Sequence, residues 1–477
     1  MTKRVFVYTF LVIFVVVFIL VSLYYSIFLC NKFYIGDAND TSELSAAPDG
    51  MNVLPGGDLI LYGSYDYGTK KDKSFYKVYN EEGKLLTYTT LGTDGRSVIM
   101  TGINATENRI IFTCIDTSLT DYLDTKCELY IVDSEYNVTQ KILLETKQEQ
   151  DAYYHVMPVD GTTDMFACVS TAYVDIFSDD GQLIYQLPIE KVAKVMCVSY
   201  TDNMFVIGGS LAPDELLDSF TDAFVAAYDV NGTKIWQNVY CENNNQVSTI
   251  VSVKHTGNGN VIAYGRYIDY SMNLEEGSSV SELSVDEFYR MTYYGNNTEF
   301  EVITPDGVKD YTLKASVFLQ TINKDGENIK NIDYNVFENY AVPMPVDVMF
   351  SGNTEFVVMT SYSLIAYKTQ TYNIDISILD SQLNMVNEYT IVPNDKTEMI
   401  FTMDEEQNIY GYYSLGGTQK YVARNLGTAE SLIEEFKIIN IAMLVRDVFV
   451  RVQEIIDLIF IGVLVFFTQS IKACRRR

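Results

Sequence analysis

Histidine, tryptophan and basic residues are scarce in this chain, and each shortage limits what the protein does. Among 477 residues there are two histidines, one tryptophan, and 34 lysines and arginines against 63 acidic residues. His155 and His255 stand far apart, with no Cys or Asp at metal-ligand spacing beside them. They predict no metal site, and we expect a structural or surface role for both.

The shortage of basic residues leaves a formal net charge of −29. Binding to phosphates requires a basic face, so this charge argues against a nucleic-acid partner. It also argues against docking on an anionic lipid surface. Acidity of this kind commonly serves solubility.

Common catalytic signatures are missing as well. The chain contains no G-x-S-x-G, P-loop or H-E-x-x-H segment, which argues against the usual nucleophile, phosphate and zinc sites. The acidic segments 178–181 and 323–326 faintly resemble calcium loops, but they lack the D-x-D-x-D-G spacing and the closing Glu. We therefore predict hairpin turns there, no catalytic residue, no metal and no cofactor, and we do not expect an enzyme.

The first 31 residues predict the location. Lys3 and Arg4 precede an uncharged apolar run from Val5 to Cys30, long enough to span a hydrocarbon core of roughly 30 Å. No A-x-A-like cleavage site follows the run, and positive charge before it keeps the N-terminus in the cytoplasm. Residues 1–31 are thus predicted to be a cytoplasmic stub and signal anchor at the plasma membrane, with a cleaved signal as the alternative. Either way, the chain that follows is exported.

The C-terminal end carries a second apolar run. Residues 455–471 are apolar apart from Asp457, and a basic cluster ending in three arginines follows. This pattern is typical of a spanning helix with a cytoplasmic tail, predicted at 455–477. The preceding segment, 439–454, mixes apolar and charged residues and is predicted to be a juxtamembrane amphipathic stretch. The alternative is an amphipathic helix lying in the membrane plane.

Between these ends, a hairpin pattern recurs: an alternating apolar strand, a turn built on Asp, Asn, Glu or Gly, and a second strand. Its copies are 75–88, 127–144, 173–189, 222–240, 316–334, 371–391 and a weaker 419–438. Two further strands precede each copy, which makes seven units of four strands. Such repetition is typical of a β-propeller, whose blades bury their faces only against neighbours. We predict an all-β, seven-bladed propeller at 50–438, preceded by a linker at 32–49. Six or eight blades are the alternatives.

The fourth unit carries a recognisable motif. Asp229, Asn231, Gly232, Lys234 and Trp236, followed by the strand 259–266, resemble the bacterial propeller repeats of the quinoprotein-like (PQQ-like) superfamily. This resemblance implies a propeller fold and an extracytoplasmic location. It does not imply the cofactor, because those dehydrogenases use several tryptophan docking positions and this chain has one Trp. The Trp-Asp dipeptide of WD repeats and the sialidase box are also absent.

Seven cysteines are too few for a disulfide scaffold. Cys114 ends one strand and Cys127 begins the next in the same expected hairpin, so the two could lie opposite each other. Outside the cytoplasm such a pair could oxidise, and we interpret it as a candidate disulfide. Cys168, Cys197 and Cys241 are expected to be small buried hydrophobic residues.

Loops between the second and third strands gather on one face of a propeller, together with the loops between blades. The longest is an insertion at 267–315, which contains an expected extra hairpin at 299–314. Its candidate partner-binding residues are Asp286, Glu287, Tyr289, Tyr293 and Tyr294. Long loops in compact folds are commonly functional, and Tyr is a good interface residue. The alternative is a solvated insertion without function.

These observations favour a membrane-anchored, extracytoplasmic binding or scaffold module with both termini in the cytoplasm. Its expected partner is another envelope or membrane protein, or a cell-surface glycan. The alternative is an extracytoplasmic glycan hydrolase, which would use two loop-face carboxylates as acid and base.

Overall fold

The chain folds into strands that group into small antiparallel sheets. The computed structural model describes residues 34–35, 48–64, 73–81, 83–92, 95–106, 109–121, 124–145, 153–190, 193–211, 221–240, 246–256, 259–269, 299–304, 307–312, 314–334, 341–351, 356–366, 371–391, 400–404, 406–414 and 421–430. Contacts divide the chain into two units, Met1–Leu426 and Gly427–Arg477. The first unit holds the sheets described below.

Seven of these sheets have four strands each, and six run in simple chain order from an inner to an outer strand. The first three blades contain β2 (Gly50–Val53), β3 (Leu59–Ser64), β4 (Ser74–Tyr79) and β5 (Leu85–Leu91); β6 (Arg96–Thr106), β7 (Arg109–Ser118), β8 (Thr125–Val132) and β9 (Val138–Leu144); and β10 (His155–Pro158), β11 (Met165–Val169), β12 (Tyr173–Ser178) and β13 (Leu183–Pro188). The next three contain β14 (Ala193–Thr201), β15 (Met204–Leu211), β16 (Asp222–Asp229) and β17 (Lys234–Tyr240); β18 (Gln246–His255), β19 (Val261–Asp269), β22 (Lys314–Ile322) and β23 (Asn328–Tyr334); and β24 (Ala341–Ser351), β25 (Phe356–Ala366), β26 (Thr371–Asp380) and β27 (Met385–Ile391).

The seventh blade is completed by the N-terminal side of the chain. It contains β28 (Ile400–Met403), β29 (Ile409–Ser414), β30 (Tyr421–Gly427) and, outermost, β1 (Tyr34–Ile35), which pairs with β30. Residues 34–35 fall within the predicted linker at 32–49, and they form this outermost strand. The weaker hairpin copy predicted at 419–438 is described as far as residue 430, and its first part forms β30, which takes β1 as its neighbour. The rest of that copy, 431–438, lies outside the described residues.

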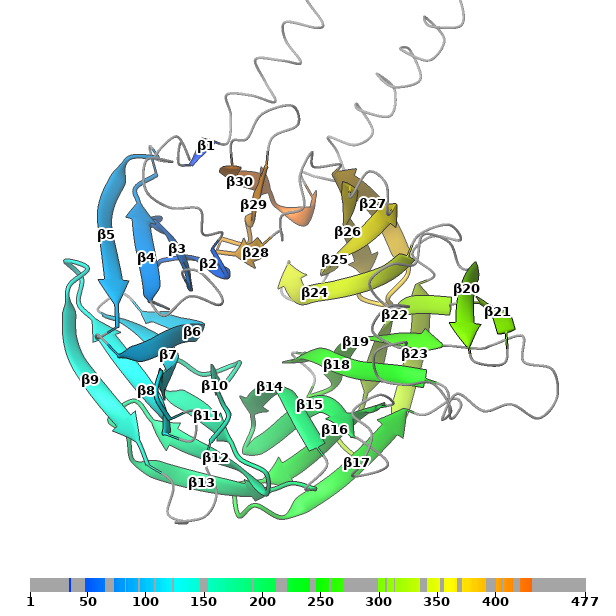
Figure 1. Cartoon of the computed structure of the whole chain (residues 1–477), viewed down its shortest axis with the longest axis horizontal. Coiled ribbons are helices and arrows are strands. Elements are labelled where there is room, and N and C mark those ends of the chain that lie inside the picture. Colours follow the sequence, from blue (N-terminus) through cyan, green and yellow to red (C-terminus); the bar gives the residue numbers. More distant parts are fainter. Residues whose placement is uncertain are drawn as a thin grey trace, which may run out of the picture. The chain divides into compact units, whose positions relative to one another are not determined.

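The blades follow one another around a ring. Each inner strand contacts the preceding blade, and the inner strands β2 and β28 join the first blade to the last (Figure 1). The predicted all-β, seven-bladed propeller with four-stranded blades is therefore confirmed. The extra hairpin within the fifth blade is confirmed too, as β20 (Glu299–Thr304) paired with β21 (Gly307–Thr312).

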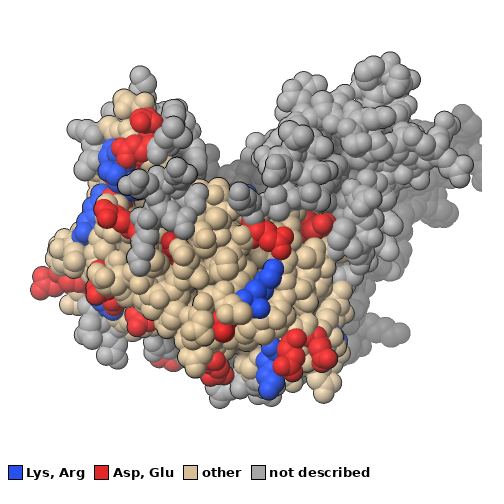
Figure 2. Space-filling view, turned by 90° about the horizontal axis from the view of Figure 1, so that it is seen from below, with Lys and Arg blue, Asp and Glu red and all other residues tan. Residues whose placement is uncertain are grey.

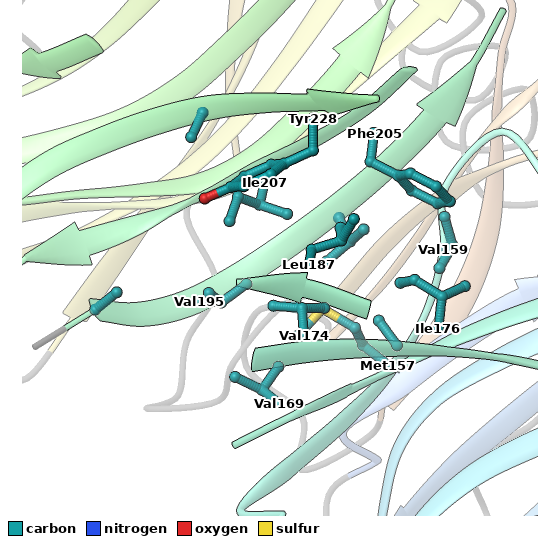
Figure 3. Packing of buried hydrophobic residues seen from close by; sticks show 14 of the residues in the cluster. Met157, Val159, Val169, Val174, Ile176, Leu187, Val195, Phe205, Ile207 and Tyr228 are labelled. Carbon is teal, nitrogen blue, oxygen red and sulfur yellow. The ribbon is translucent and has the colours of Figure 1, made fainter. Parts of the chain in front are cut away.

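Hydrophobic side chains fill the spaces between blades. On β12, Val174 and Ile176 point into a cluster shared with the fourth blade, where they meet Phe205 and Ile207 of β15 (Figure 3). Phe177 of β12 belongs instead to a cluster shared with the second blade. Because side chains alternate across a strand, a blade buried on both faces needs apolar residues at consecutive positions. This explains the near-continuous apolar runs of the middle strands.

The outer hairpins share one turn geometry, which accounts for the repeated motif in the sequence. In the fourth blade, Asp229 Oδ1 accepts hydrogen bonds from the backbone N–H groups of Asn231 (2.9 Å) and Thr233 (2.8 Å). Gly232 takes a positive φ of 76°, which glycine adopts without steric cost. The strand register then shifts by one residue and leaves Ile235 as a bulge. The bulged residues of six blades are Leu86, Thr139, Ile184, Ile235, Ile329 and Val386.

The turns of the third, fourth and fifth blades also pack on the outer strand of the blade before them. Trp236 Nε1 donates a 3.0 Å hydrogen bond to the carbonyl of Lys324, and Asn238 Nδ2 donates one of 2.9 Å to the carbonyl of Gly326. A Cβ added at Gly326 would lie 2.6 Å from Trp236 Cγ. The single tryptophan thus joins the fourth blade to the fifth, which is a structural role.

The register contradicts the candidate disulfide. Cys127 pairs with Ile115 and Cys114 pairs with Glu128, so the two thiols lie on opposite faces of the second blade. Cys114 belongs to a cluster shared with the first blade, and Cys127 to one shared with the third. Cys114, Cys127 and Cys168 are all free thiols in this structure. The prediction was wrong because an odd offset between paired strands reverses the face on which a side chain lies.

Several predictions fall on residues that the structure does not describe. Within the described residues, no helix has the length and hydropathy needed to cross a membrane. The predicted spans at 1–31 and 455–477 and the amphipathic stretch at 439–454 lie outside them. The candidate partner-binding residues of the insertion, Asp286, Glu287, Tyr289, Tyr293 and Tyr294, lie outside them as well.

Candidate functional site

Two polar features stand out among the described residues, and they lie on opposite faces of the propeller. Antiparallel order places the connections from the first strand to the second, and from the third to the fourth, on one face. Connections from the second strand to the third, and between blades, lie on the other, which we call the loop face. A charged network lies at the loop face, and an open hollow lies at the opposite face.

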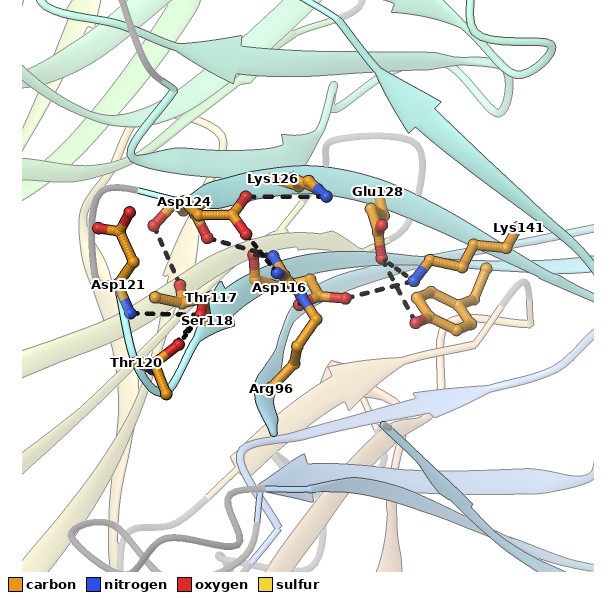
Figure 4. A network of polar contacts seen from close by, with 12 residues as sticks. Arg96, Asp116, Thr117, Ser118, Thr120, Asp121, Asp124, Lys126, Glu128 and Lys141 are labelled. Atoms are coloured by element: carbon orange, nitrogen blue, oxygen red, sulfur yellow. Dashed lines mark hydrogen bonds and ion pairs between the residues drawn. The ribbon is translucent and has the colours of Figure 1, made fainter. Parts of the chain in front are cut away.

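The charged network joins all four strands of the second blade (Figure 4). Arg96, at the start of β6, forms ion pairs with Asp116 at the end of β7 and with Asp124 just before β8, the second at 2.6 Å. Its terminal nitrogen Nη2 also donates to the backbone carbonyls of both acids at 3.1 Å. Hydrogen bonding to Arg96 lowers the pKa of Asp124. The guanidinium of Arg96 therefore holds the connection between β7 and β8 in contact with the start of β6.

Lys141, on the outer strand β9, extends the network to a second buried acid. Its ammonium lies 2.6 Å from Glu128 Oε2 and 3.3 Å from Asp116 Oδ2. Asp116 is 2% exposed and Glu128 is 4% exposed. Glu128 therefore depends on this cation for charge compensation, whereas Asp116 is compensated by both Lys141 and Arg96. Burial raises the pKa of Glu128, and hydrogen bonding to Lys141 opposes that shift. Because the ammonium stands between the two acids, the arrangement stabilises the fold rather than presenting two free carboxylates.

The open hollow lies where the third and fourth blades meet. It has a volume of about 660 Å³ and is formed by the β10–β11 connection and the end of β14. The lining residues are Gly161, Thr162, Thr163, Asp164, Met165, Tyr200, Thr201 and Asp202. Hydroxyl groups both donate and accept hydrogen bonds, whereas the two carboxylates only accept. The lining therefore suits a ligand rich in hydroxyl or ammonium groups.

Backbone hydrogen bonds hold the two walls of the hollow together. Asp160 N donates to the carbonyl of Val198, and Tyr200 N donates to the carbonyl of Asp160, both at 2.9 Å. Gly161 has φ of +82°, and a Cβ there would lie 2.5 Å from the carbonyl oxygen of Tyr200. Glycine is thus required for this close approach. The hollow is pre-formed by two blades rather than by a single loop.

Charged groups flank the hollow on the side of the fifth blade. Lys254 Nζ lies 2.7 Å from Asp160 Oδ1, so this carboxylate is compensated. Burial lowers the pKa of the neighbouring His255, and the charges of Asp160 and Asp202 oppose the shift. Asp164 and Asp202, at the surface of the hollow, remain the carboxylates available to a ligand.

The surface around the outer strands carries little positive charge. On the side shown in Figure 2, uncharged side chains cover most of the described surface, and acidic residues lie in small groups with few basic residues among them. That side offers no basic face of the kind that binds phosphates.

Sequence reasoning did not find either feature. The hollow arises from two short connections, 159–164 and 202–203, whereas the predicted partner-binding site belongs to the long insertion at 267–315, which connects strands at the opposite face. One signal was available: Gly161 and Asp164 interrupt the apolar pattern before β11. The described structure holds no group of three or more potential metal ligands.

Comparisons with known proteins identify no family for this chain. No family model matches the chain, and no curated protein matches it either. Solved structures similar to it include the Pan2 WD40 domain of Neurospora crassa, at 9% identity over 80% of this chain and 90% of that one with a TM-score of 0.44. Another is the periplasmic gluconolactonase PpgL of Pseudomonas aeruginosa, at 8% identity over 73% of this chain and 86% of that one with a TM-score of 0.44. Likenesses at this level carry no functional information, and the quinoprotein-like repeat stays a resemblance.

Proposed function

We propose that this protein is a membrane-anchored, extracytoplasmic binding module that recognises a hydroxyl-rich or cationic envelope ligand through the hollow of the third and fourth blades. The observation that carries the proposal is the hollow itself, with its two exposed carboxylates and its three threonines. A pre-formed polar concavity loses little conformational freedom on binding, which favours affinity.

The location belongs to the same proposal. It is supported by the two apolar runs at the ends of the chain and by the positive charges that flank them. The quinoprotein-like repeat of the fourth blade fits an exported propeller. Residues 1–31 would anchor the module, and 455–477 would form a second span with a cytoplasmic tail.

A glycan hydrolase at the loop face has less support. A retaining glycosidase needs two carboxylates about 5–5.5 Å apart on either side of the sugar. In the described part of the loop face, Asp116 and Glu128 share the Lys141 ammonium, and Asp116 and Asp124 share the Arg96 guanidinium. The described hollow lies on the opposite face.

The location is tested by surface labelling. An amine-reactive reagent that does not cross membranes is applied to intact cells and, separately, to permeabilised cells. Lys84 and Lys234, both exposed on the propeller, are expected to be labelled to the same extent in the two samples. Labelling that requires permeabilisation would contradict an extracytoplasmic propeller.

Binding is tested with the full chain in detergent against a panel of envelope glycans and basic peptides. The Asp164→Asn/Asp202→Asn variant is expected to weaken binding at least about tenfold, since each lost charge-assisted hydrogen bond contributes roughly 1.5–3 kcal/mol. Asn tolerates the positive φ of 48° at Asp202, so the fold is retained.

A matched control removes two exposed carboxylates away from the hollow, Asp121→Asn and Glu145→Gln. This control should bind like the wild type. The hollow is not the site if both variants bind equally, or if no member of the panel binds the wild type.

A further inference from the structure

Cys127 and Cys168 meet in the space between the second and third blades. Cys127 lies on β8 and is 1% exposed, and Cys168 lies on β11 and is 0% exposed. Both belong to the hydrophobic cluster that these two blades share, with Phe166 and Phe177 among its members. The strands come from neighbouring blades and are separated by β9 and β10 in the chain (Figure 1).

The strand β10 fixes how the two thiols approach. Cys127 Sγ lies 3.9 Å from the carbonyl oxygen of His155 on β10. The next residue, Val156, pairs directly with Cys168. Burial raises the pKa of Cys168, and the neighbouring Cys127 raises this pKa further.

We propose that Cys127 and Cys168 form a covalent modification site, in which they are oxidised to a disulfide that joins the second blade to the third. Side chains of two packed sheets can span such a gap, as the inter-sheet disulfide of immunoglobulin domains does. The pair lies between the second and third blades, whereas the ligand hollow lies between the third and the fourth. The disulfide proposal depends on the proposed export in one respect, which is that an oxidant is available outside the cytoplasm.

The reaction is a thiol–disulfide exchange with a small or protein disulfide as oxidant. One thiolate attacks the oxidant and displaces a thiol, and the second cysteine then attacks the mixed disulfide and displaces another. One S–S bond forms between Cys127 Sγ and Cys168 Sγ, and the oxidant is reduced to two thiols that carry the two electrons and two protons. Burial, followed by hydrogen bonding to Cys127, raises the pKa of Cys168. The thiol is therefore protonated in the folded protein, and we expect the bond to form chiefly while the chain folds.

Cys114 provides an internal control. It is 0% exposed like Cys168, but it lies on the opposite face of the second blade and in a different cluster. Burial raises its pKa as well. Oxidation governed by burial alone would treat the two residues alike, whereas the proposed pair requires two thiols in the same space between blades.

The test is disulfide mapping of the full chain. Protein isolated from membranes is alkylated without reductant and digested with trypsin, and a second sample is first treated with diamide in mild urea. Cleavage after lysine and arginine places Cys127 in peptide 127–141, Cys168 in peptide 148–191 and Cys114 in peptide 110–126, each with a single cysteine. We expect peptides 127–141 and 148–191 to appear linked, with the loss of two hydrogen atoms, and Cys114 to be alkylated.

Two variants check specificity. In Cys168→Ser, Cys127 should be recovered alkylated, and in Cys114→Ser the linked peptides should persist. A link in either wild-type sample supports the pairing. Both cysteines alkylated in both samples, or either one linked to a different cysteine, would overturn it. The two proposals can also be told apart. If the peptides are linked only after diamide treatment, and surface labelling requires permeabilised cells, the Cys127–Cys168 pairing is supported and the extracytoplasmic location is contradicted.

Discussion

Gly232→Ala should destabilise the propeller more than the same change at Gly259, although both glycines have the same positive φ. Each has a φ of +76° in a hairpin turn. Giving an L-residue a left-handed conformation costs roughly 1–2 kcal/mol, and this part of the loss should be common to both variants.

The two sites differ in their surroundings. A Cβ at Gly232 would lie 2.4 Å from the carbonyl oxygen of Gln186 on the preceding blade, whereas nothing lies within 4 Å of a Cβ at Gly259. The close neighbour is backbone, so the turn or the strand must move, and overpacking of this kind typically costs about 1–3 kcal/mol more. We expect a total loss of roughly 2–5 kcal/mol for Gly232→Ala and roughly 1–2 kcal/mol for Gly259→Ala.

The assay is urea denaturation followed by far-UV circular dichroism and by the fluorescence of Trp236, the sole tryptophan. Trp236 lies on β17, beside the Gly232 turn, so its emission reports on the contact between the fourth blade and its neighbours. Equal losses for the two variants would refute the reasoning, because they would show that the contact between blades contributes nothing beyond the turn conformation.

Two further predictions concern charge. The Lys141→Met variant removes the ammonium that pairs with Asp116 and Glu128. Breaking a buried ion pair usually costs about 3–5 kcal/mol, but solvent screens this pair because the Lys141 side chain is 41% exposed. We therefore expect the free energy of unfolding to fall by roughly 1–3 kcal/mol at neutral pH. That loss should shrink in acid as Glu128, whose pKa is raised by burial, becomes protonated. The Lys126→Met variant, at a side chain that is 44% exposed, should be nearly neutral. A loss that does not depend on pH would contradict the assignment. Burial lowers the pKa of both His155 and His255 in the folded protein; the unfolded chain therefore binds protons more readily, and stability should fall as pH drops below about 6.5. The melting temperature of the His155→Gln/His255→Gln variant should no longer show this fall in acid. If its dependence on pH matches that of the wild type, the two histidines are not the cause of the acid sensitivity.

Parts of the fold were readable from the sequence for a definite reason. Each blade repeats an apolar strand, a turn beginning at Asp, Asn or Ser, and a second strand, and both the turn and the strand period are local properties. Gly232 and Asp229 could be recognised because the turn needs a left-handed residue and a side-chain acceptor. The strand count, the blade count and the extra hairpin at 299–314 followed from this local chemistry.

What the sequence left undecided depends on which segments meet in space. The pairing of β1 with β30, far apart in the chain, carries no local signal, and neither does the approach of Gly161 to Tyr200 that shapes the hollow. Cysteine pairing shows the difference most clearly. Nearness in sequence suggested Cys114 with Cys127, but alternation across the strands placed them on opposite faces of one blade, and ring packing brought Cys127 to Cys168 of the next. The sequence by itself determined the strands, their turns and their repetition, because those depend on neighbouring residues; the tertiary structure alone decided which faces of different blades come together.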